Sequence, residues 1–345
     1  MQQNSRFFAH LPNCPIGPIN HIDHIPHIDH IDHIDHIDHI NHIDHINYMH
    51  PVDSLHLQFN PNQMIVLNIA MAFLMFSVAL DVKFADFRKV VEFPQSVGVG
   101  LLAQFLVFPL LTLGIIWLFQ PPVSVALGMV LVSMCPSGNM TNFLVHFAKA
   151  NVPLSVTLNA IIILSATFVT PAGFLFWSKF VPESEAIRQS FELEFADMAL
   201  IIIQLIVAPL LLGIWLHERK PDFVARIRPW AQRLSLLIFF AILVLALLGN
   251  SDNILNYLGF IFVIVAVHNI VALSNGYFLG MLFRVPKQDR RTLAFEGGVH
   301  NTALGLLLIF KFFGGLGGMA LIAAWWGIWD LVTGMGLAYW WRQRP

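Results

Sequence analysis

The sequence predicts an all-α polytopic membrane protein with about nine transmembrane helices. Hydrophobic residues make up 57% of its 345 positions and charged residues 12%, about half the charged share of a soluble domain. The mean hydropathy is +0.68. Stretches apolar enough to cross about 30 Å of hydrocarbon recur along the chain. They lie at 63–80, 96–119, 123–147, 153–177, 197–216, 234–249, 256–283, 292–312 and 315–341.

Residues 1–60 are predicted to form a low-complexity, disordered tail ahead of a transmembrane domain at 61–345. His-Ile-Asp repeats over residues 20–47, and a period of three fits neither a helix face nor a strand face. Three explanations stay open: an inert tail, a tail whose imidazoles and carboxylates bind divalent ions, or a repeat translated from a start placed too early, with Met49 or Met64 as the true beginning.

The distribution of lysine and arginine predicts the orientation of the helices. With the N-terminus outside, 15 of the 19 basic residues fall on the cytoplasmic side, and four remain outside: Arg6, Lys179, Arg188 and Lys311. Cytoplasmic loops of membrane proteins carry the excess of lysine and arginine. We therefore expect an integral protein of the plasma (inner) membrane with an external N-terminus and a cytoplasmic C-terminus.

Two of the apolar stretches are interrupted midway by small and polar residues. The third contains Pro136 and Gly138, and the eighth contains Gly297 and Gly298 beside the acid Glu296. Proline lacks the amide hydrogen that a helix needs, and glycine permits unwinding. A membrane helix is broken at depth only where the freed backbone groups face protein, water or a ligand. Paired interruptions of this kind point to the binding site of a secondary transporter.

Polar side chains accompany both interruptions. No basic residue in its own span lies near enough to neutralise Glu296, and an acid at membrane depth indicates function because its burial is costly. Ser155 and Asn159 lie one helical turn apart after the first interruption, and Glu296 and His300 are expected one turn apart at the second if the helix is partly kept. Carboxylate, carbonyl and amide oxygens are hard ligands that suit sodium or a proton. The half-helix that starts near Thr141 offers free amides and a positive dipole end to an anion.

Several of these residues also have structural explanations that the sequence leaves open. Pro136 alone is compatible with a simple kink, and Gln104, inside the second span, with a hydrogen bond between helices. Asp330, beside Trp329 in the last span, stays open between a structural pair and a functional role. Cys14 and Cys135 lie in settings too different to suggest a disulfide.

Five motifs between residues 60 and 341 occur together in the order typical of one transporter family. Residues 135–142 (CPSGNMTN) resemble its CPGGTASN signature, and residues 148–157 (AKANVPLSVT) resemble AKGDxxLSV. Residues 296–302 (EGGVHNT) resemble ExGxQNS, and residues 75–80 (MFSVAL) resemble MFGMGL. Residues 104–109 fit QFxxxP. The chain thus resembles the bile acid:sodium symporter family.

The resemblance implies a fold and a set of site residues. The family fold consists of two inverted repeats of five helices that form a panel domain and a core domain, with two broken helices that cross in the core. By this resemblance the first helix of the family fold would be absent here, which would leave nine. By matching position, the first sodium site would use Thr141, Asn142, Ser155, Asn159 and Glu296. The second would use Gln104, Glu296, His300 and the backbone carbonyls of Gly297 and Val299. Substrate would lie near the crossover, at Asn139, Asn301 and Thr302.

Several positions depart from the family pattern. His300 stands where the family has glutamine, and an imidazole nitrogen is a poorer sodium ligand that can also be protonated near neutral pH. The second sodium site is therefore open to loss or to replacement by a proton. Asp330 stands where relatives carry histidine or asparagine, which would discourage a bulky anion if Asp330 lines the cavity. Asn139 replaces a threonine, which alters a substrate contact.

The sequence as a whole predicts sodium-coupled symport of a small organic anion by alternating access, with one or two sodium ions and no organic cofactor. The alternatives are a proton-coupled carrier or exporter on the same fold, a non-transporting anion-binding sensor, and a metal-handling protein fed by the histidine-rich tail. We expect the lipid bilayer and a small organic anion as partners, and no nucleic acid. No enzyme activity is expected, because Glu296 has neither a nucleophile nor a metal partner in the sequence.

Overall fold

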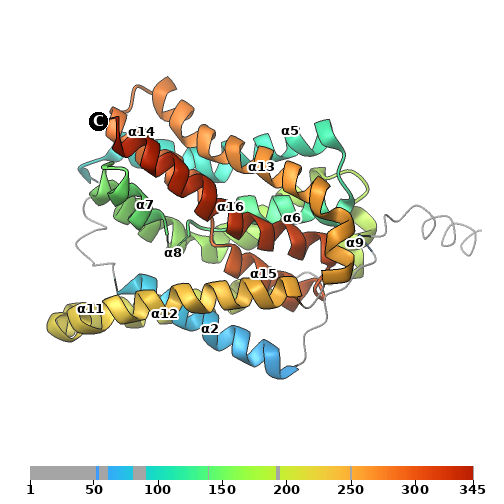
Figure 1. Cartoon of the computed structure of the whole chain (residues 1–345), viewed down its shortest axis with the longest axis horizontal. Helices are drawn as coiled ribbons and strands as arrows, with labels where there is room; N and C mark the ends of the chain where they lie inside the picture. The colour runs from blue at the N-terminus through green and yellow to red at the C-terminus, as the bar shows by residue number, and fades with distance from the viewer. Residues whose placement is uncertain are drawn as a thin grey trace, which may run out of the picture. The chain divides into compact units, whose positions relative to one another are not determined.

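The computed structural model describes residues 52–53, 61–80, 91–138, 140–191, 195–248 and 251–344 (Figure 1). These residues fold into helices, and the one extended pairing among them is an isolated bridge. The helices up to residue 190 are α2 (Pro61–Ala79), α4 (Pro94–Leu102), η2 (Ala103–Val107), α5 (Phe108–Phe119), α6 (Val123–Met134), α7 (Thr141–Phe147), α8 (Val152–Trp177), η3 (Ser178–Phe180) and α9 (Glu185–Ser190). Those after it are α10 (Phe195–Ile202), η4 (Ile203–Val207), α11 (Ala208–Arg219), α12 (Pro221–Leu248), α13 (Ser251–Leu282), α14 (Lys287–Gly298), α15 (Thr302–Phe312) and α16 (Gly317–Arg342).

Many of the helices are long and apolar enough to cross a membrane. Five continuous stretches in the described residues meet both requirements: Pro94–Phe119, Val152–Phe180, Ala196–Arg219, Gly259–Leu282 and Gly317–Arg342. Shorter apolar helices include Val123–Met134 and Thr302–Phe312, which are the halves of interrupted spans. The prediction of an all-α polytopic membrane protein is confirmed, whereas the number of crossings stays a prediction.

Both predicted interruptions are present. Helix α6 ends at Met134, and Cys135 is extended, with φ −69° and ψ 144°, before α7 begins at Thr141. Helix α14 ends at Gly298, and Val299 is extended, with φ −114° and ψ 110°, before α15 begins at Thr302. The chain therefore crosses each interruption without regular helical hydrogen bonds, and its free backbone groups need other partners.

Two spans contain a π-helical turn directly before a proline. The turn η2 precedes Pro109, and η4 precedes Pro209. Proline has no amide hydrogen, so the preceding turn loses one ordinary helical bond and widens. The side chain of Asn275 in α13 donates to the carbonyl of Ala103 at 2.9 Å. The widened turn places the buried Gln104 inside the protein, whereas the matching Gln204 is exposed.

Two sets of helices in the described domain pack closely within themselves. Helix α2 packs along α11 and α12, and the hydroxyl of Ser77 in α2 donates to that of Ser235 in α12 at 3.3 Å. Helices α6, α13, α14, α15 and α16 pack mainly on one another, and Trp326 and Phe108 are among the largest side chains buried there. Figure 1 shows α2, α11 and α12 together, apart from α13, α14 and α16. Both interruptions lie in the second group.

Two residues of the predicted tail belong to the described part of the chain. Val52 and Asp53 are buried, and the carboxylate of Asp53 accepts the backbone N–H of Ser124 at 2.8 Å. Ser124 lies in the first turn of α6, where amides lack helical partners. The His-Ile-Asp repeat lies outside the described residues. Its metal-binding explanation and the boundary at residue 60 therefore stay predictions.

Removal of the Asp53 carboxylate should destabilise the start of α6. We expect Asp53→Ala to lower the free energy of unfolding by about 0.5–2 kcal/mol, because the buried amide of Ser124 loses its acceptor. The measurement is the thermal unfolding midpoint of the purified protein in detergent. Asp53→Asn is the matched control, since it keeps an oxygen at the same position. Equal midpoints for the wild type and Asp53→Ala would show that this hydrogen bond contributes nothing.

Candidate ion and substrate site

The two interruptions meet and pair through their backbones. Ser137 and His300 form an antiparallel bridge. The amide of Gly138 donates to the carbonyl of Val299 at 2.9 Å, and the amide of Asn301 donates to the carbonyl of Pro136 at 2.8 Å. Each interruption therefore satisfies polar groups that the other leaves free, as the interior of a membrane requires. The pairing also brings Glu296 to the first interruption, because the hydroxyl of Ser137 donates to its carbonyl at 3.1 Å.

Glu296 lies within a cluster of oxygen atoms. Its side chain is only 2% exposed, and its Oε1 is 2.5 Å from the hydroxyl of Ser155. The same hydroxyl lies 2.8 Å from Oδ1 of Asn142. A serine hydroxyl has one proton, so it can donate to only one of these two acceptors at a time. Three buried or half-buried oxygens thus converge at the hydroxyl of Ser155.

Further oxygens of the first predicted sodium set lack hydrogen-bond partners. The hydroxyl of Thr141 is buried and unpaired, as are both polar atoms of the Asn159 side chain and Oε2 of Glu296. Thr141 precedes Asn142 in α7, and Asn159 lies one turn after Ser155 in α8. Buried polar atoms normally have hydrogen-bond partners. The unpaired oxygens of these side chains are therefore candidates to contact a bound ligand.

The residues of the second predicted sodium site make fewer contacts with one another. Gln104 and His300 are in contact, but in the part of the chain that the structure describes neither is hydrogen-bonded to Glu296. The amide nitrogen of Gln104 lies 3.0 Å from the carbonyl of Cys135 and 3.2 Å from Nε2 of His300. A carbonyl can only accept, so the nitrogen of Gln104 donates on this side, and Nε2 of His300 accepts as in a neutral imidazole. The oxygen of Gln104 is buried without a partner, whereas the carbonyl of Val299 already accepts from Gly138.

One relation expected from the sequence is absent. Glu296 and His300 would be stacked one turn apart only if the helix continued, but α14 ends at Gly298 and Val299 is extended. Among the described residues, the Glu296 side chain hydrogen bonds to neither Gln104 nor His300. Gly297 is buried in the last turn of α14.

Two of the predicted substrate residues, Asn301 and Thr302, lie at the start of α15. The side-chain oxygen of Asn301 accepts the amide of Leu304 at 3.1 Å and so caps α15. Its nitrogen is 3.5 Å from the sulfur of Met75. Thr302 is buried, and its hydroxyl has no partner. Asn139 lies outside the described residues.

A cavity of about 720 Å³ borders both interruptions. One wall contains Gly138, His300, Asn301 and Asp330, and the opposite wall is formed by α2 and α12. The volume is within the range of small-molecule sites. Glu296 does not line this cavity. Asn142 borders the cavity, whereas Ser155 and Glu296 of the same oxygen cluster lie outside its lining.

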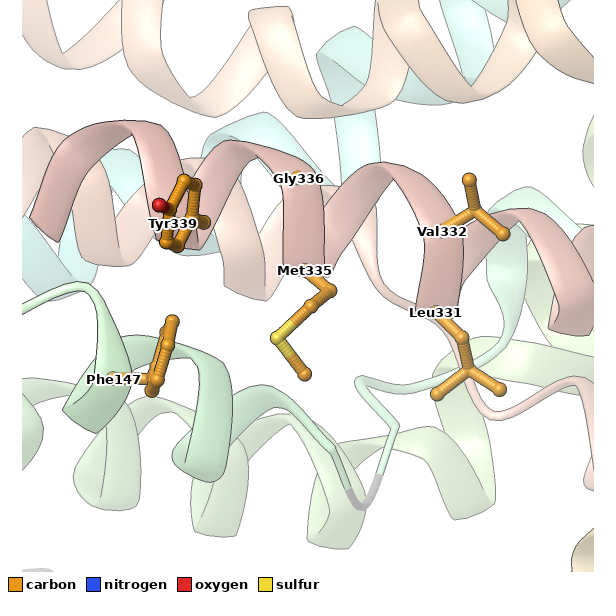
Figure 2. Close-up of a pocket in the computed structure, with 6 residues that line it drawn as sticks. All are labelled: Phe147, Leu331, Val332, Met335, Gly336 and Tyr339. Carbon is orange, nitrogen blue, oxygen red and sulfur yellow. The ribbon is translucent and has the colours of Figure 1, made fainter.

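A second hollow between α7 and α16 has a different character. It measures about 580 Å³ and is lined by Phe147, Leu331, Val332, Met335, Gly336 and Tyr339. Figure 2 shows Phe147 of α7 facing the α16 side chains across it. Only Tyr339 among these carries a polar side-chain atom, and Val332 and Tyr339 are exposed. This hollow offers no ligand set for an ion, so the cavity at the interruptions is the candidate site.

Sequence reasoning did not single out the polar residues of α13 that support the site. The amide of Asn269 donates to the carbonyl of Gly298 at 3.3 Å and to Asp330 at 2.9 Å. The ring of His268 stacks on one side of Phe108 at 5.0 Å, and the ring of His300 lies 5.2 Å from the same phenylalanine. The available signal was a His-Asn pair in the middle of an otherwise apolar span.

Comparison with known proteins identifies the family of the chain. Residues 68–257 match the family described as "Sodium Bile acid symporter family". A "Probable sodium/metabolite cotransporter BASS2, chloroplastic" of Oryza sativa subsp. japonica is 31% identical over 247 residues, which cover 71% of this chain and 56% of that protein. An "Uncharacterized sodium-dependent transporter YocS" of Bacillus subtilis (strain 168) is 27% identical over 279 residues, covering 81% and 83%.

A third relative has the same coverage pattern as the rice protein. The "Probable sodium/metabolite cotransporter BASS6, chloroplastic" of Arabidopsis thaliana is 30% identical over 254 residues, which cover 71% of this chain and 60% of that protein. The chain therefore spans little more than half the length of these two plant relatives. The family match covers more than half of the chain and includes the first interruption and its partners in α8. The protein belongs to the sodium bile acid symporter family.

Proposed function

We propose that this protein is a sodium-coupled symporter that carries a small organic anion by alternating access. The observation that carries the proposal is the buried oxygen cluster of Glu296, Ser155 and Asn142 at the point where the two interrupted helices pair. A cation at this point would neutralise the carboxylate and supply the unpaired oxygens with a partner.

The donor set fits sodium better than a transition metal. It consists of a carboxylate, hydroxyls and amide oxygens, which are hard ligands. The side-chain oxygens of Thr141 and Asn159, which have no hydrogen-bond partner, would complete the coordination of the first ion. A second ion would use the unpaired oxygen of Gln104 together with backbone carbonyls at Gly297 and Val299. We therefore expect one or two sodium ions, with the Glu296 site occupied more tightly.

Ion and anion would be coupled because they share the same backbone. The bridge from Ser137 to His300 contacts Glu296 through the hydroxyl of Ser137, and it borders the cavity through His300. Sodium bound at the oxygen cluster would stabilise the bridge and so fix the start of α15. We expect the substrate there, at Asn301 and Thr302 together with Asn139. Two ligands that stabilise the same arrangement raise each other's affinity. Movement of α2, α11 and α12 as a panel against the other helices would then expose the cavity alternately to each side.

The relatives and the charge pattern support this assignment. The names of the plant relatives describe sodium/metabolite cotransport, and that of the bacterial relative describes sodium dependence. The distribution of lysine and arginine supports a plasma (inner) membrane location with the N-terminus outside and the C-terminus in the cytoplasm. On this basis we propose a transporter without enzyme activity or organic cofactor.

The test is uptake of organic anions into proteoliposomes that contain the purified protein. We expect an inward sodium gradient to accelerate uptake of at least one small carboxylate, while an equal potassium gradient does not. Thermal unfolding without lipid vesicles should show a sodium-dependent rise in the midpoint, and the carboxylate should enlarge it. Uptake at the same rate in sodium and potassium would rule out sodium coupling. Stabilisation by both ligands with no flux would indicate a non-transporting sensor.

A proton-coupled carrier is the second candidate, and His300 favours it. The imidazole replaces the glutamine of the family motif and lies 3.2 Å from Gln104. Because Gln104 donates to Nε2, the ring in this structure is a neutral acceptor. A proton on Nε2 would break that hydrogen bond and free Gln104. A coupling proton on His300 would thus change the hydrogen bonding of Gln104 in the second predicted sodium set and leave the oxygen cluster around Glu296 as it is.

Replacement of His300 by glutamine distinguishes the two candidates. For a sodium symporter, we expect His300→Gln to lower the sodium concentration that gives half-maximal uptake, because an amide oxygen is a better ligand than imidazole. For a proton-coupled carrier, the same change should abolish uptake driven by a pH gradient. The measurement is uptake under a sodium gradient alone and a pH gradient alone. His217→Gln, on the separate helix α11, is the control and should change neither.

A further inference from the structure

Asp330 lines the cavity with a carboxyl group. In a carrier of simple anions, an acidic side chain in this position would be unexpected. Asp330 lies in α16, is 5% exposed and borders the cavity together with His300 and Asn301. It is the one acidic residue among the described residues that line the cavity. Glu296, the other acid near the interruptions, lies outside the lining.

Hydrogen bonds hold this carboxylate in one orientation. The backbone amide of His300 donates to Oδ2 at 3.0 Å, and Nδ2 of Asn269 donates to Oδ1 at 2.9 Å. The same Asn269 nitrogen lies 3.3 Å from the carbonyl of Gly298, which can only accept, so the amide is oriented with its nitrogen toward Asp330. Each carboxylate oxygen therefore accepts one hydrogen bond from the protein.

A carboxylate fixed in this way selects for positive charge in the cargo. A second carboxylate against Asp330 would meet a like charge and acceptors without protons, which is unfavourable in a buried site. An ammonium group would instead donate charge-assisted hydrogen bonds to it. Asp330 therefore disfavours a cargo that is anionic over its whole length.

Helix α12 contributes positively charged side chains to the lining of the cavity. Arg228, Gln232 and Arg233 of α12 line the same cavity. A guanidinium group matches a carboxylate in shape and offers several donors to it. The cavity thus has acceptor character on the α16 side and donor character on the α12 side.

We propose that the cargo is a small aminocarboxylate, with an ammonium group that contacts Asp330 and a carboxylate that lies toward the arginines of α12. This inference rests on the proposed function and narrows the substrate class from organic anions in general to carboxylates that also carry an amino group. Asp330 is the specificity-determining residue, because it contacts the cargo and not the ion cluster around Glu296.

The test compares matched ligands that differ only in the amino group. Glycine, β-alanine, 4-aminobutanoate and 5-aminopentanoate are each paired with the carboxylate of equal chain length that lacks the amine: acetate, propanoate, butanoate and pentanoate. Thermal stabilisation of the full-length protein in sodium gives an apparent affinity for each. We expect at least one amino member to bind about 10-fold or more tightly than its partner, the effect of a hydrogen bond to a charged group.

Two variants and one control assign the preference to Asp330. Asp330→Asn should remove the advantage of the amino member and leave the midpoint shift caused by sodium alone, which also shows that the variant is folded. Arg233→Gln should weaken binding of both members of a pair. Asp197→Asn, an exposed acid of α10, should change nothing.

The outcomes separate failure of this inference from failure of the proposed function. If the wild type binds simple carboxylates in a sodium-dependent manner but never prefers the amino member, the aminocarboxylate assignment is wrong and the symporter remains. If Asp330→Asn loses the sodium shift itself, Asp330 belongs to the ion site and the inference is also overturned. If neither series nor sodium stabilises the protein, both proposals fail.

Discussion

Glu296→Gln should abolish the sodium dependence of this protein while leaving it folded. The substitution keeps the shape of the side chain and one oxygen, but removes the charge that would hold the cation. Sodium affinity should fall by at least about the 10–100-fold typical for the loss of groups that merely support a metal site. Without sodium, the variant should be as stable as the wild type or more so, because a buried carboxylate without a cation is costly.

The measurement is the thermal unfolding midpoint with sodium and with potassium, followed by uptake under a sodium gradient. The sodium-induced shift should vanish in Glu296→Gln, and gradient-driven uptake should vanish with it. Glu185→Gln is the matched control, because Glu185 is exposed at the start of α9 and makes the same change of charge. A sodium shift of normal size in Glu296→Gln would mean that the oxygen cluster binds no cation.

Gly138→Val should separate the two interruptions and stop transport. A Cβ atom at Gly138 would lie 3.0 Å from the carbonyl oxygen of His300 and 3.3 Å from its carbon. Both are backbone atoms of the bridge, so they cannot move aside as a flexible side chain would. Overpacking of this kind costs about 1–3 kcal/mol. We expect a lower unfolding midpoint and loss of the stabilisation by sodium, since the paired interruptions hold Glu296 through the hydroxyl of Ser137.

The control for Gly138→Val is Gly98→Val. Gly98 lies in α4, and a Cβ there would meet no atom within 4 Å. Gly138→Ala, which adds a single methyl group, should give an intermediate sodium shift. If Gly138→Val retains the full sodium-induced shift, the ion cluster does not depend on the bridge, and the coupling argued from the shared backbone is refuted.

The interruptions were predictable because their chemistry is local. Pro136 and Gly138 in one span, and Gly297 and Gly298 in another, break helices by the properties of their own backbones. The unusual acid at Glu296 was equally visible, since a charge in an apolar span stands out in any reading of the sequence. The family motifs around these residues led to the correct family.

The hydrogen-bond pattern of the site was less accessible. The sequence suggested that Glu296 and His300 share one helix face. In the structure Val299 between them is extended, so the two side chains contact different residues. His300 is hydrogen-bonded to Gln104, and Glu296 accepts a hydrogen bond from Ser155. Asn269 went unnoticed because a single amide in an apolar span is as often a helix-packing residue as a supporting group. The groupings into two sodium sites and a substrate site stay predictions.

By itself, the sequence determined that the protein is a helical membrane protein with two interrupted spans and an acid beside one of them, since hydrophobicity, proline and glycine act within a few residues. Only the tertiary structure decided that the interruptions pair with each other, that Glu296 lies outside the lining of the cavity and that Asp330 belongs to it. Ser137 and Glu296 are 159 positions apart, and their contact depends on how whole helices pack. Packing joins distant residues through shape and shared hydrogen bonds, which no local pattern in the chain records.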